Sequence, residues 1–144
     1  MKNLLLLIHI FIAFIASNSI ANSCRRDFDI ESLDKRAEII ITANVVKDSG
    51  FYFFNRKYTL NVLNTYKGIP QKEITVWSKK SEASCGIKLE AGYTYVFFVY
   101  KVDDKLWITS GSSWPLITDY KKQIEDFNKF FNLKNGSLIT AANP

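Results

Sequence analysis

Apolar and polar residues alternate along most of the chain between Ala37 and Ser110, and this period of two predicts β-strands. The stretch is also rich in Val, Ile, Tyr, Phe and Thr, the residue types that favour strands. We expect the first strand to end at the turn signal Asp48-Ser49-Gly50. The five predicted strands cover residues 37–47, 51–66, 73–78, 93–102 and 105–109.

The fourth predicted strand is apolar at both its odd-numbered and its even-numbered positions. Its two alternating sets are Tyr95, Phe97 and Val99, and Val96, Phe98 and Tyr100. A strand of this kind is expected to be covered on both faces. Together with the long second strand, it predicts a mainly β fold, a five-stranded closed barrel.

The hydrophobic period changes from two to between three and four after Pro115. The apolar positions are Ile117, Tyr120, Ile124, Phe127 and Phe131. This spacing predicts an amphipathic C-terminal helix over residues 115–132 that docks on the barrel, with Asn135-Gly136 as its stop. No repeat, low-complexity tract or linker divides the sequence, so we expect one domain over residues 24–144.

The first 23 residues have the pattern of a secretory signal peptide: a short basic start, an apolar run from Leu4 to Ala16 and a polar end. A membrane span needs about 20 apolar residues, so this run is too short for one. We therefore expect a secreted protein without a transmembrane span, extracellular or, in a bacterium, periplasmic. Cleavage before Cys24 and cleavage after Ala21 both fit the small residues present, and a lipoprotein-type cut at Cys24 is a further alternative.

Charge and histidine content narrow the function classes. The formal net charge is +5, and the basic residues are scattered rather than clustered, which argues against nucleic-acid binding. The single histidine, His9, lies in the predicted signal peptide, which removes Ser-His and Cys-His nucleophilic sites from the mature domain. No Gly-rich phosphate loop or Cys-x-x-Cys motif is present. We predict a monomeric protein that is not an enzyme and needs no cofactor.

The two cysteines are Cys24, at the start of the predicted mature chain, and Cys85. In a secreted domain two cysteines usually form one disulfide. The simplest interpretation is that this disulfide only stabilises the fold.

Several short motifs follow one another in a particular order. After Cys24 come the strand Ile39 to Val46, Tyr66-Lys67-Gly68, Ser84-Cys85-Gly86, Gly92-Tyr93-Thr94-Tyr95, Leu106-Trp107-Ile108-Thr109 and Trp114-Pro115. In this order and spacing the mature chain resembles the tissue inhibitors of metalloproteinases within the netrin-like group. The resemblance implies an oligonucleotide/oligosaccharide-binding (OB) type barrel with Cys24 bridged to Cys85.

The resemblance also implies a mechanism and a set of site residues. The expected partner is a zinc metalloprotease. The free α-amine and the carbonyl oxygen of a terminal Cys24 would coordinate the zinc in its active site. Arg25 would point into the protease pocket, with Arg26 next to it on the binding surface. The neighbouring ridge would consist of Glu82, Ala83 and Ser84, ending at Cys85.

Two departures from the family pattern leave an alternative open. Arg26 stands where a second N-terminal cysteine is expected, and Ser110-Gly111 where its partner is expected. Arg25 is large and charged where the family favours a small residue, so a matrix-type protease pocket fits it less well. The alternative function is a netrin-like module that binds a protein, a glycan or a lipid surface without inhibiting a protease.

Overall fold

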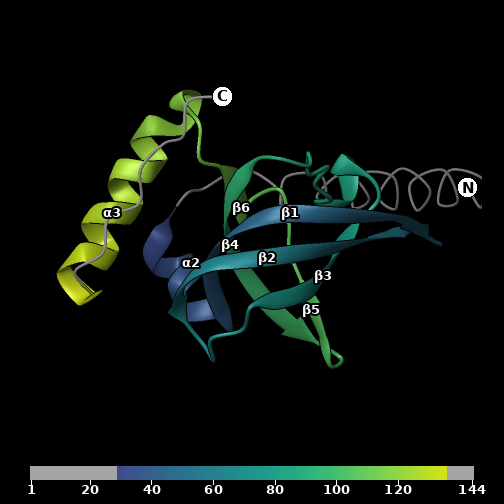
Figure 1. The fold of residues 1–144 in the computed structure, drawn as a ribbon, viewed down its shortest axis with the longest axis horizontal. Coiled ribbons are helices and arrows are strands. Elements are labelled where there is room, and N and C mark those ends of the chain that lie inside the picture. The colour runs from purple at the N-terminus through teal and green to yellow at the C-terminus, as the bar shows by residue number, and fades with distance from the viewer. Residues whose placement is uncertain (1–28, 136–144) are drawn as a thin grey trace, which may run out of the picture.

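The computed structural model describes residues 29–135, with side chains to residue 131, and has a mainly β fold with a C-terminal helix (Figure 1). This confirms the prediction of a mainly β fold with a C-terminal helix. The helices and 3-10 turns are α2 (Ile30–Arg36), η2 (Glu82–Ser84), η3 (Thr118–Tyr120) and α3 (Lys121–Asn135). The strands are β1 (Ile39–Tyr52), β2 (Asn55–Lys67), β3 (Glu73–Lys79), β4 (Thr94–Val102), β5 (Lys105–Trp107) and β6 (Ser113–Pro115).

The strand pairings follow one another in a ring. β1 pairs with β2, β2 with β3, and β4 with both β5 and β1, all antiparallel. A parallel pairing of β3 and β5 through Trp77 and Trp107 connects the two halves. β6 pairs with β4 at Tyr95–Phe97, next to the part of β4 that pairs with β5.

The predicted end of the first strand was wrong. Asp48-Ser49-Gly50 lies inside β1, where the register with β2 shifts between Asp48 and Phe51. Gly50 has φ +78°, and its N–H donates to the Asp48 carboxylate at 2.8 Å. The irregularity is therefore a bulge within the strand rather than a turn. The chain turns at Phe53-Phe54 instead, so β2 begins at Asn55, later than predicted.

Apolar residues pack on both faces of β4, as its sequence predicted. One set, with Phe97 and Val99, joins the core enclosed by the ring of strands. The other set, with Val96 and Phe98, joins a second core beneath the helices. Figure 1 shows α2 and α3 on the same side of the sheet, which is the side of this second core.

The start of the C-terminal helix differs from its prediction, whereas its end at Asn135 agrees with the predicted stop Asn135-Gly136. Ser113–Pro115 forms β6 and Thr118–Tyr120 forms η3, so α3 begins at Lys121 and continues to Asn135. Ile117 was predicted to pack on the barrel, but it precedes η3 and lines a cleft instead. Ile124, Phe127 and Phe131 are buried as predicted.

The short helix α2 was not predicted from the sequence. α2 has seven residues and buries only Ile30 and Leu33, too few positions to show a helical period. Asp29 caps it by accepting a hydrogen bond from the Glu31 N–H at 3.2 Å.

No helix among residues 29–135 is long and apolar enough to span a membrane.

Candidate functional site

The ridge Glu82–Cys85 is a tight, exposed structure between β3 and β4. Glu82, Ala83 and Ser84 form the 3-10 turn η2, and all three are exposed. The Ser81 hydroxyl caps the turn by accepting a hydrogen bond from the Ala83 N–H at 3.2 Å. Cys85 ends it in the left-handed conformation, with φ +62°. The three residues expected in a partner-binding ridge are therefore accessible and locally ordered by backbone contacts.

Further hydrogen bonds hold the end of the ridge in place. The Cys85 carbonyl accepts from the Ser110 N–H at 3.0 Å, and the Gly86 N–H donates to the Ser81 carbonyl at 2.9 Å. Cys85 is not a free thiol. The other predicted site residues, Cys24, Arg25 and Arg26, lie outside the described residues, so the bridge between Cys24 and Cys85 stays a prediction.

The glycine of the Ser84-Cys85-Gly86 motif is required by close packing. A Cβ on Gly86 would lie 2.1 Å from the Lys79 carbonyl oxygen and 2.8 Å from that of Ser81. Both neighbours are backbone atoms of the strand and turn that carry the ridge, and they cannot rotate away. Gly86 therefore lets the chain after the ridge lie directly against the end of β3.

Gly86→Ala is expected to lower the free energy of unfolding by about 1–3 kcal/mol, because overpacking forces the backbone to shift. Urea denaturation measures the change. Gly111→Ala is the matched control, since a Cβ there meets nothing closer than the Thr109 side chain at 4.0 Å. Equal stabilities of the two variants would contradict this account of the motif.

Hydroxyl groups fix the loop that follows the ridge, although residues 87–90 have no regular secondary structure. The Tyr58 hydroxyl donates to the Ile87 carbonyl at 3.1 Å and accepts from the Leu89 N–H at 3.3 Å. The Ser78 hydroxyl accepts from the Ile87 N–H at 3.0 Å, and the Tyr95 hydroxyl accepts from the Glu90 N–H at 3.0 Å. Side chains from three strands thus give this loop a defined shape.

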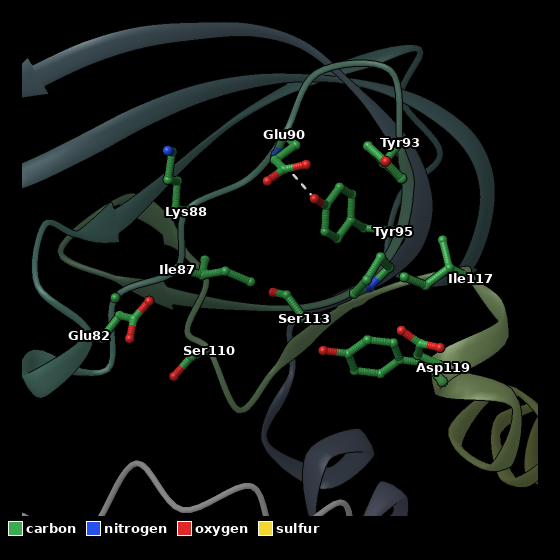
Figure 2. A pocket seen from close by; sticks show the side chains of 13 residues that line it. Glu82, Ile87, Lys88, Glu90, Tyr93, Tyr95, Ser110, Ser113, Ile117 and Asp119 are labelled. Carbon is green, nitrogen blue, oxygen red and sulfur yellow. Dashed lines mark hydrogen bonds between the residues drawn. The ribbon is translucent and has the colours of Figure 1, made fainter. Parts of the chain in front are cut away.

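A cleft of about 590 Å³ lies between this loop and the segment that leads into α3 (Figure 2). Glu82 of the ridge and Gly86, the residue after it, line the cleft together with Tyr93 and Tyr120. The ridge and the cleft therefore form one continuous surface. That surface combines a projecting element with a recess, as a protein-binding site can.

Carboxylates dominate the charges of the cleft. Glu82, Glu90 and Asp119 line it, against a single lysine, Lys88. Figure 2 shows Glu82 and Asp119 on opposite sides of the recess, with Glu90 near Tyr95. This charge balance favours a cationic or hydrogen-bond-donating group from a partner.

The titratable groups that line the cleft are carboxyl, phenol and lysine side chains. No group of three His, Cys, Asp or Glu side chains in the described part of the chain is arranged to hold a metal ion. Burial raises the pKa of the Tyr95 hydroxyl above its usual value.

Sequence reasoning identified the ridge but missed the cleft. Tyr93 and Tyr95 were recognised as part of a motif and a strand, without a role at the surface. Asp119 and Tyr120 were assigned to a helix that begins only after them. No local signal marked these residues, because the cleft is assembled from segments that lie far apart in the sequence.

Comparisons with known proteins add no assignment: no protein-family model matches the chain, and no curated protein matches it. The resemblance to the tissue inhibitors of metalloproteinases thus rests on the order of the motifs alone and stays a prediction.

Proposed function

We propose that this protein is a secreted inhibitor of zinc metalloendopeptidases built on a closed, OB-type barrel. The mature chain would begin at Cys24, whose α-amine and carbonyl oxygen bind the zinc of the protease. The ring of pairings among β1, β2, β3, β5 and β4 supports such a barrel scaffold. The protein supplies no metal of its own, because the zinc belongs to the partner.

The observation that carries this proposal is the ordered, exposed ridge Glu82–Cys85. The backbone of Cys85 is held from two sides, by Ser110 and by the turn at Glu82. A disulfide from Cys85 would therefore fasten Cys24 next to a rigid ridge rather than to a mobile loop. Rigid presentation lowers the ordering cost of binding and so favours tight inhibition.

The chemistry of a terminal cysteine fits this role. An α-amine has a pKa near 8, so a substantial fraction is neutral at physiological pH and can donate its lone pair to zinc. A catalytic zinc keeps one coordination position for the water that attacks the substrate. Amine and carbonyl ligands from Cys24 would displace that water and stop hydrolysis.

The predicted disulfide can be tested by intact-mass measurement of the secreted protein. Without reduction, an alkylating reagent is expected to add nothing, and after reduction it should modify both Cys24 and Cys85. Alkylation of two thiols in the unreduced protein would contradict the bridge and the rigid ridge that depends on it. Because the chain has two cysteines, the measurement has no ambiguity of pairing.

The function itself is tested by titrating a panel of zinc endopeptidases with secreted protein whose N-terminus has been sequenced. Protein that begins at Cys24 is expected to inhibit at least one member of the panel, reversibly and at one-to-one stoichiometry. If such protein inhibits none of them, the alternative is a binding module without protease inhibition.

A further inference from the structure

Four consecutive aromatic residues form the end of the β1–β2 hairpin, and they are strongly exposed. The exposed fractions are 53% for Phe51, 64% for Tyr52, 80% for Phe53 and 81% for Phe54. We call these four residues the aromatic tip. Figure 1 shows β1 and β2 running out together beyond the rest of the sheet, so the aromatic tip lies at the end of a projecting hairpin.

The turn at the tip is strained in a way that its sequence does not relieve. Tyr52 pairs with Asn55, which leaves Phe53 and Phe54 as a two-residue turn. Phe53 has φ +56°, a conformation that two-residue hairpin turns normally give to glycine, asparagine or aspartate. A bulky aromatic residue in this conformation lowers the stability of the folded state. Because the turn is strained and both rings are strongly exposed, we infer that Phe53 and Phe54 have a role other than stabilising the fold.

Basic side chains surround the aromatic tip. Arg56 and Lys80 lie over the Phe51 ring, at 4.3 and 4.7 Å from its centre. The Lys80 N–H also donates to the Phe54 carbonyl at 2.9 Å, which ties the end of β3 to the turn. We call Arg56, Lys57, Lys79, Lys80 and Lys105 the basic girdle.

The aromatic surface continues from the tip onto the outer face of the sheet. Tyr52 contacts Trp77 at a ring distance of 6.2 Å, and Trp77 contacts Trp107 at 6.4 Å. Lysines of the girdle cover these indoles: Lys105 lies 5.0 Å from the Trp77 ring and Lys79 lies 5.0 Å from the Trp107 ring. Rings and ammonium groups therefore alternate over this face.

Most of the positive charge in the girdle is not neutralised. Asp48 pairs with Arg56 at 3.5 Å. The four lysines of the girdle form no ion pair with any residue in the described range 29–135. A partner of this surface must accept exposed aromatic rings and supply negative charge around them.

We propose that the aromatic tip and the basic girdle bind the surface of membranes that contain anionic phospholipids. Aromatic rings partition into the interface between acyl chains and headgroups, and lysines beside them attract anionic headgroups. A fluid interface admits a projecting tip without a matching pocket, which favours a membrane over a folded partner. This binding goes beyond the proposed inhibition and does not require a free amine at Cys24.

The first test is co-sedimentation of the full secreted protein with vesicles of phosphatidylcholine, with and without phosphatidylserine. The protein is expected to bind the anionic vesicles more tightly and to lose binding at high salt. Trp77 and Trp107 are half-buried beside the tip, so their fluorescence should shift to shorter wavelength on binding. Absence of binding to anionic vesicles would overturn the proposal.

The double variant Phe53→Asn, Phe54→Gly separates binding from folding. Asn tolerates the positive φ of position 53 and Gly tolerates any φ at position 54, so the melting temperature should stay the same or rise. Loss of two rings should weaken vesicle binding by about a hundredfold. The control is Ile69→Ser, which removes an apolar side chain that is 79% exposed beyond the other end of β2. Wild-type binding by the double variant would contradict a role for the tip.

Charge is tested with Lys79→Gln, Lys80→Gln, which should weaken binding to anionic vesicles by about fivefold per lysine. Protein with one residue added ahead of Cys24 is expected to bind vesicles like the native protein, so failure of the inhibitor proposal and failure of this one are distinguishable. Binding to heparin or to a single-stranded oligonucleotide, without binding to vesicles, would assign the surface to a soluble polyanion and refute the membrane proposal.

Discussion

One residue added ahead of Cys24 is expected to abolish inhibition of zinc proteases while leaving the fold intact. The addition converts the α-amine into an amide, whose nitrogen has no basic lone pair for zinc. It also places an extra residue where the metal must sit. Loss of a direct metal bond should cost on the order of 4 kcal/mol, about a thousandfold in inhibition constant.

The experiment compares native and extended protein against the same protease, with thermal melting of both as the control for folding. Arg25→Thr provides a second comparison, because Arg25 would enter the specificity pocket rather than bind the metal. This variant should change which proteases are inhibited, while chelation persists. Equal inhibition by the native and extended forms would exclude a role for the amine.

The strands with a regular pattern were predicted well from the sequence. In β3 the burial alternates as expected, with Ile74 and Val76 inside and Trp77 half-exposed. Both faces of β4 are buried, because the ring of strands encloses one face and the helices cover the other. Here the hydrophobic period and the tertiary structure point to the same answer.

Where local and tertiary preferences differ, the sequence was a poor guide. Asp48-Ser49-Gly50 has the composition of a turn, yet pairing with β2 continues past it and reduces it to a bulge. The true turn, Phe53-Phe54, carries no turn signal, since aromatic residues favour strands. β6 is three residues long and exists through its pairing with β4, which a local pattern cannot reveal.

The candidate site was predictable in part for the same reason. The motif Ser84-Cys85-Gly86 is contiguous in sequence, so the family resemblance could place a ridge beside it, and an exposed turn lies at that position. The adjoining cleft is assembled from the loop at Glu90, the strand at Tyr95 and the segment at Asp119. These parts are distant in the sequence and come together only in the tertiary structure.

The helix α3 is expected to contribute several kcal/mol through one side chain, Phe127. This residue is fully buried and packs edge-on against Tyr66 of β2, with a distance of 5.0 Å between ring centres. Its ring also lies 6.0 Å from Phe98 of β4 and 6.4 Å from Trp114 of β6. Phe127 therefore connects the helix to three strands at once.

Phe127→Ala should lower the free energy of unfolding by about 3–5 kcal/mol, because it removes a buried ring and leaves a cavity among aromatic neighbours. Chemical denaturation monitored by tryptophan fluorescence measures the change, and Trp114 reports on the site directly. Lys129→Ala is the control on the same helix, since Lys129 is exposed and its truncation should change stability by less than about 0.5 kcal/mol. If the two variants unfold at the same denaturant concentration, α3 does not dock on the sheet through Phe127. A large loss confined to Phe127→Ala would instead establish the second core, on which the arrangement of β4, β6 and the cleft beside them depends.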